Sequence, residues 1–87
     1  MKVSKVEILP IRPREGLIGF ATVELDGQIL LNSIAIHSKR DGSGYRLTYP
    51  TRSNGDSAIT VFHPTSPQLS WEIERMVFAR VREIFEI

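Results

Sequence analysis

Hydrophobic and polar residues alternate along most of the chain as far as Phe62, which is the pattern of strands that bury one face. The segments with this period of two are residues 2–12, 17–25, 28–37, 45–49 and 58–62. Pro10 has no amide hydrogen to donate to a ladder, so we expect the first strand at an edge of the sheet or bulged there. The pattern predicts a small antiparallel sheet of about five strands.

The turn between the second and third predicted strands has the strongest signal. Asp26-Gly27 lies between two alternating runs, and this pair accepts the positive φ angles of a type I′ hairpin turn. A two-residue loop here pairs Val23 with Leu30, Ala21 with Asn32, Gly19 with Ile34 and Leu17 with Ile36. We expect this largely apolar face to meet the core, and the opposite, mixed face to be partly covered.

A second signal of the same type is Asn54-Gly55, between residues 45–49 and 58–62. Pro50 interrupts the ladder that this turn would start, so the sequence leaves open how closely the two strands pair.

A helix is predicted over residues 67–85. Ser66 is a favoured N-cap, Pro67 suits the first helical position, and neither glycine nor proline follows. Two apolar stripes run along this helix. The first contains Leu69, Ile73, Met76, Val77 and Ile84, and the second contains Trp71, Phe78 and Phe85, with Val81 between the two. Strands followed by one C-terminal helix predict an α+β fold.

The apolar arc of the helix is about twice the ~100° that a helix on one sheet needs. One stripe covers the sheet. The second stripe, Trp71, Phe78 and Phe85, is either covered within the monomer by a curled sheet or a loop, or forms the interface of a homodimer. A chain this short has a thin core, which favours the homodimer.

Length and composition narrow the class of protein. The 87 residues suffice for one domain, residues 1–87. The absence of cysteine excludes disulfides and thiolate chemistry. No apolar run approaches the ~18 residues of a membrane span, and no signal-peptide stretch begins the chain. We therefore expect a cytoplasmic protein with no membrane partner.

The residues that could carry catalysis are scattered. His37 and His63 lie in different segments, and neither has a carboxylate at metal-ligand spacing. Gly42-Ser43-Gly44 is too short for a phosphate-binding loop, and no nucleophile motif occurs. We predict that the protein is not an enzyme and uses no cofactor, metal or small-molecule substrate.

The net charge of +1 gives no hint of a partner, but the basic residues are unevenly spread. Residues 1–14 are basic, the following hairpin is acidic, and residues 37–53 are basic again, with Lys39, Arg40, Arg46 and Arg52. Serine and threonine in the same segment could donate to phosphates. Tyr45 and Tyr49 either stack on bases or face the core. The segment is thus a candidate nucleic-acid site, unless its charges are merely solvated loop residues.

Several short features occur in an order known from one family. They are the hairpin turn after Leu25-Asp26, the strand that ends at Tyr49-Pro50, the junction Phe62-His63-Pro64, and a helix with Ile73, Val77 and Val81. In this order, over residues 2 to 86, the chain resembles the stage V sporulation protein G family, also called septation protein.

The resemblance implies a homodimer that regulates septation, cell division or sporulation by binding DNA, and in some members RNA. The family's basic element follows the proline that ends the fourth strand, which here is Pro50-Thr51-Arg52-Ser53. This chain has Arg52 alone where family members carry two adjacent basic residues. The expected nucleic-acid contacts are Arg52 and Thr51, with Arg46, Lys39 and Arg40 nearby. The alternative is a protein–protein adaptor that has the same fold but has lost nucleic-acid binding.

Overall fold

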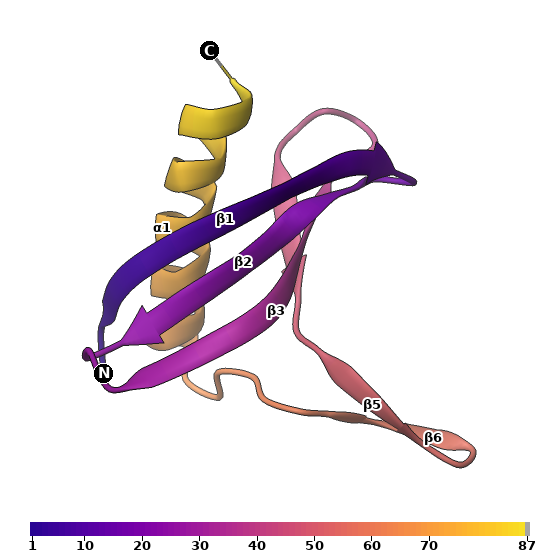
Figure 1. Ribbon diagram of the computed structural model, residues 1–87, viewed down its shortest axis with the longest axis vertical. Coiled ribbons are helices and arrows are strands. Elements are labelled where there is room, and N and C mark those ends of the chain that lie inside the picture. The colour runs from indigo at the N-terminus through magenta and orange to yellow at the C-terminus, as the bar shows by residue number, and fades with distance from the viewer. Residues whose placement is uncertain (87) are drawn as a thin grey trace.

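A computed structural model describes residues 1–86 and confirms the α+β fold (Figure 1). A four-stranded antiparallel sheet has the order β1-β2-β3-β4, and a separate two-stranded hairpin precedes the C-terminal helix. The elements are β1 (Val3–Arg14), β2 (Leu17–Leu25), β3 (Ile29–Ser38), β4 (Tyr45–Thr48), β5 (Thr51–Asn54), β6 (Ser57–Thr60) and α1 (Pro67–Phe85). The described chain therefore has one strand more than the sequence pattern predicts.

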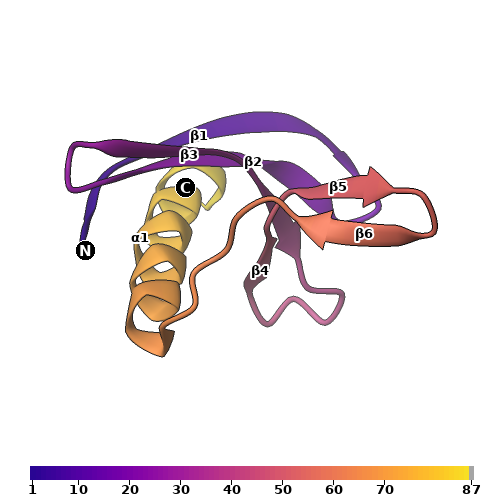
Figure 2. The same cartoon turned by 90° about the horizontal axis from the view of Figure 1, so that it is seen from below.

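The core lies between the four-stranded sheet and α1, which covers one face of the sheet only (Figure 2). The helix contributes three fully buried side chains, Ile73, Val77 and Val81. The sheet contributes the inward side chains of its two central strands, which are Ile18, Ala21, Val23, Leu25, Ile34 and Ile36. Helix α1 makes most of its contacts with the edge strand β1, and it also contacts β2 and β4.

Strand β1 is an edge strand, as Pro10 predicts, but it extends two residues beyond the expected end of the segment 2–12, to Arg14. Its register with β2 shifts between Pro10 and Arg14, which marks a bulge. Gly19 lies opposite Pro10, and a Cβ at Gly19 would approach the Leu9 carbonyl oxygen to 2.7 Å. Only glycine therefore fits where these two backbones meet.

The turn at Asp26-Gly27 is confirmed, but the predicted register is wrong. Both residues have positive φ, and the amide of Gln28 donates to the carbonyl of Leu25 at 2.9 Å. The ladder resumes one residue later than expected, so Val23 faces Leu31.

A bulge at Ser33, whose φ is 65°, shifts the register by a second residue. Ala21 therefore faces Ile34, and Gly19 faces Ile36. Because of the bulge, odd-numbered residues point inward before Ser33 and even-numbered residues after it, so Ile34 and Ile36 reach the core. A strict period of two could not show this reversal.

Residues 45–49 do not pair across the second turn signal. Strand β4 pairs with β3 instead, and the partner of β6 is β5, the four residues that follow Pro50. The loop between β5 and β6 is Gly55-Asp56, since Asn54 pairs directly with Ser57. Among these residues only Gly55 has positive φ, as in a type II′ turn rather than type I′.

The helix begins and ends where the sequence predicts. The Ser66 side chain accepts a hydrogen bond from the amide of Leu69 at 3.1 Å, and Pro67 occupies the first turn. No helix in the described chain has both the length and the apolar character needed to cross a membrane.

Candidate nucleic-acid interface

Basic side chains gather at one end of the four-stranded sheet. The turn between β1 and β2 and the loop between β3 and β4 lie side by side there, because the amide of Ser38 donates to the carbonyl of Gly16 at 2.8 Å. We call this region the basic end and define it by Arg12, Arg14, Lys39, Arg40 and Arg46, all of which are exposed.

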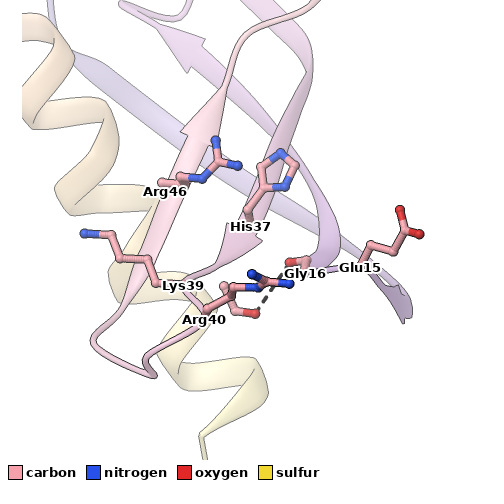
Figure 3. A pocket seen from close by; sticks show the side chains of 7 residues that line it. Glu15, Gly16, His37, Lys39, Arg40 and Arg46 are labelled. Atoms are coloured by element: carbon pink, nitrogen blue, oxygen red, sulfur yellow. Dashed lines mark hydrogen bonds between the residues drawn. The ribbon is translucent and has the colours of Figure 1, made fainter.

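Three of these cations line one concave surface. Figure 3 shows Lys39, Arg40 and Arg46 around it, with His37 beside Arg46. Glu15 and Gly16 of the neighbouring turn complete its rim. In this view the guanidinium groups of Arg40 and Arg46 extend towards the side of His37 and Glu15, and the Lys39 side chain extends away from them. An anion at this surface could therefore contact both guanidinium groups.

Hydrogen bonds within the β3–β4 loop hold its backbone in place. The amide of Lys39 donates to the carbonyl of Gly44 at 2.8 Å, and the amide of Gly42 donates to the carbonyl of Lys39 at 3.0 Å. Asp41 accepts a hydrogen bond from the amide of Ser43 at 2.9 Å, and the hydrogen bonds from Ser43 lower the pKa of Asp41. The loop's one carboxylate is therefore engaged within the loop.

His37 and Arg46 form a cross-strand pair between β3 and β4. The Nε2 atom of His37 lies 3.0 Å from the Thr48 hydroxyl, so the ring is held by its edge. Partial burial lowers the pKa of His37, and the positive charge of Arg46 adds to this effect. Both effects favour the uncharged form of the His37 ring.

Within residues 1–86, the cations of the basic end form no salt bridge with a carboxylate. Residues 1–86 contain two salt bridges, Lys5–Glu7 at 3.0 Å and Arg80–Glu83 at 2.5 Å, and neither involves the basic end. Unpaired Arg and Lys side chains are those that can neutralise phosphates without first breaking an ion pair.

Thr51 and Arg52 lie elsewhere. They are exposed on β5, in the hairpin that projects away from the β3–β4 loop in Figure 1. Arg52 lines a different hollow, together with Ser53, Asn54 and Ile59, and this hollow shares no residue with the basic end. One chain therefore brings Lys39, Arg40 and Arg46 together but keeps Arg52 and Thr51 apart from them.

The two tyrosines face the core. The ring of Tyr45 packs against Phe78 and that of Tyr49 against Phe62, each with centroids 6.0 Å apart. Of the two interpretations of these tyrosines, packing against the core is confirmed.

The residues suggested for a dimer interface differ in exposure. Phe78 is half-buried beside Tyr45, whereas Trp71 is 65% exposed and Phe85 is 36% exposed. The Arg75 guanidinium lies 5.2 Å from the Trp71 ring centre and covers part of it. The monomer thus leaves Trp71 and Phe85 on its surface.

Sequence reasoning missed Arg12 and Arg14 as members of the site. The basic excess in residues 1–14 is visible in the sequence. Its place at the same end of the sheet as the β3–β4 loop depends on the long first strand and on the contact between Ser38 and Gly16, which joins segments distant in the chain.

The chain matches no family model and no curated protein. The likeness to the septation protein family therefore remains an expectation from the order of its motifs.

Proposed function

We propose that the protein is a non-enzymatic, cytoplasmic nucleic-acid-binding regulator of the septation protein type, which binds the phosphate backbone of DNA or RNA at the basic end. The observation that supports this most strongly is that Lys39, Arg40 and Arg46 line one concave surface, with Glu15 on its rim, and form no salt bridge within residues 1–86. Backbone contacts position a protein on nucleic acid but carry no sequence information.

Weak sequence specificity follows from the helix. A recognition helix presents polar side chains to base edges in the major groove. The exposed side of α1 instead carries both signs of charge, as in the Arg80–Glu83 pair, together with the apolar Trp71. We therefore propose that α1 stays off the nucleic acid and serves a homodimer contact through Trp71, Phe78 and Phe85.

A mobility-shift titration at low salt tests this proposal. The site variant is Lys39→Gln/Arg40→Gln/Arg46→Gln. The control variant removes the same charge from exposed positions outside the basic end, Lys2→Gln/Lys5→Gln/Arg80→Gln. We expect the site variant to bind far more weakly than the control variant, because it lacks the cations that neutralise phosphates and not only net charge. Equal weakening in both variants would mean that binding depends on net charge and not on the cations of the basic end.

The substitution Arg52→Ala tests whether the β5–β6 hairpin binds phosphate in addition to the basic end. If the hairpin also binds phosphate, this single substitution weakens binding and flattens the salt dependence by about 0.9 for each duplex phosphate that Arg52 neutralises. If only the basic end binds, Arg52→Ala leaves both quantities unchanged.

A protein–protein adaptor is the second candidate, and the face of the sheet opposite α1 favours it. Leu9 is 65% exposed and Leu30 is 59% exposed on strands β1 and β3. The adaptor predicts no shift with DNA or RNA at any salt concentration, together with a protein partner that no longer binds the Leu9→Ser variant.

A further inference from the structure

The sheet has an outer face that no described element covers. Helix α1 packs on the inner face, and Figure 2 shows the opposite side of the sheet open. Alternation along each strand assigns the side chains. On β3, Ile34 and Ile36 point inward, so Ala35 and His37 point outward. On β2, Ala21 is buried on the inner face, so Phe20 points outward.

An apolar row crosses the middle of this outer face. Leu9 of β1 is paired with Phe20 of β2, Phe20 with Ala35 of β3, and Ala35 with Thr48 of β4. Phe20 is half-buried and lines a shallow hollow of the outer face together with Leu9, Thr22, Asn32 and Ser33. The sheet thus presents an aromatic side chain at a hollow from one of its two central strands.

A second row follows at the basic end. His37 of β3 is paired with Arg46 of β4 and with Leu17 of β2. His37 and Phe20 are diagonal neighbours on the two central strands, so their backbones lie roughly 7–8 Å apart. A hydrogen bond between His37 Nε2 and the Thr48 hydroxyl holds this ring by its edge.

The two ends of the outer face carry different charges. Arg46, Lys39 and Arg40 lie at the end nearest His37. The opposite end carries the carboxylates of Glu7 and Glu24, next to Lys5 and Leu30. A polyanion is therefore attracted over His37 and Phe20 and repelled beyond them.

We propose that the outer face of the sheet binds single-stranded nucleic acid, with unpaired bases stacked on Phe20 and His37 and the adjacent phosphates held by Arg46, Lys39 and Arg40. This inference rests on the proposed function and adds its substrate class. Stacking on a sheet face needs bases free of a partner, as in single-stranded loops and ends, and each stacked base contributes appreciably to binding. A duplex can offer only its phosphates to the same cations.

Fluorescence anisotropy with three labelled probes of equal charge tests the inference. The probes are a short thymidine oligonucleotide, the same length of abasic sugar-phosphate, and a duplex. We expect the thymidine strand to bind best. Phe20→Leu, which keeps apolar volume but removes the ring, should weaken thymidine binding roughly 5- to 150-fold. Phe20→Tyr should restore it.

Matched controls separate stacking from folding and from charge. Ile29→Ala removes an exposed apolar side chain at the far end of β3 and should leave thymidine binding unchanged. His37→Leu should weaken binding and His37→Phe should retain it. None of these variants should alter affinity for the abasic strand, because that probe has no base to stack.

The outcomes distinguish this inference from the proposed function. If Phe20→Leu binds thymidine as the unaltered protein does, while the site variant at Lys39, Arg40 and Arg46 does not bind, the basic end binds phosphate and the outer face does not bind bases. Equal affinity for the thymidine and abasic strands would overturn the inference in the same way. No binding to any probe would overturn both proposals.

Discussion

The hydroxyl of Tyr49 is buried without a hydrogen-bond partner, although the rest of the ring packs against Phe62. Burial raises the pKa of Tyr49 to about 12, and the charge of Glu74 acts in the same direction. A buried polar group without a partner costs ~1–3 kcal/mol of folding free energy. The side chain is therefore a weak point in an otherwise apolar core.

Tyr49→Phe should raise the free energy of unfolding by about 1 kcal/mol, because it removes the unpaired hydroxyl and keeps the ring. Tyr45→Phe is the matched control and should lower stability, since the Tyr45 hydroxyl donates to Glu86. Because the folded pKa of Tyr49 lies above its unfolded value, the unfolded chain loses its proton first. Stability therefore falls as pH rises above about 10, and this loss should be smaller in Tyr49→Phe. Urea unfolding at pH 7 and pH 10.5 measures both effects. A destabilised Tyr49→Phe would mean that its hydroxyl has a partner.

At the scale of elements, the sequence predicts local signals better than long-range pairing. The start of the helix is predicted because Ser66 and Pro67 act locally on its first turn. The register of β3 is not predicted, because the bulge at Ser33 goes with the packing of Ile34 and Ile36 against β2 and α1, which are distant in the sequence. For the same reason Lys39, Arg40 and Arg46 can be selected from sequence, but the separation of Arg52 from them cannot.

The strands of the β5–β6 hairpin pair only with each other. All eight of its residues are exposed, and none of the described strands or the helix packs against it. An isolated two-stranded hairpin is marginally stable in water.

Backbone amides of residues 51–60 should therefore exchange with solvent faster than those of any other strand, while amides of β2 and β3 exchange only on global unfolding. Hydrogen exchange followed by mass spectrometry measures this. Protection of the hairpin equal to that of β2 would contradict the isolated hairpin and indicate that another surface covers it.

At the scale of the whole molecule, the main open feature is the apolar side of α1, which a single chain leaves exposed to solvent. Trp71 is the single tryptophan, and its ring is 65% exposed in the monomer. If a homodimer forms through Trp71, Phe78 and Phe85, the emission of this tryptophan shifts to shorter wavelength as protein concentration rises, because its ring leaves water.

The same concentrations should give a dimer in sedimentation. Trp71→Ala/Phe85→Ala should give a monomer, whereas Leu9→Ala/Leu30→Ala, on the outer face of the sheet, should leave the dimer intact. A monomer of the unaltered protein at micromolar concentration would contradict the proposed interface.

Nucleic-acid binding by the basic end is the central claim, and the salt dependence of affinity tests it most directly. Each neutralised phosphate contributes about 0.9 to the slope of log affinity against log salt on duplex DNA, and about 0.7 on a single strand. Lys39→Gln/Arg40→Gln/Arg46→Gln should therefore lower the duplex slope by about 2–3, whereas Lys2→Gln/Lys5→Gln/Arg80→Gln should leave it nearly unchanged. The same slope for all three proteins, or no binding at low salt, would contradict the claim.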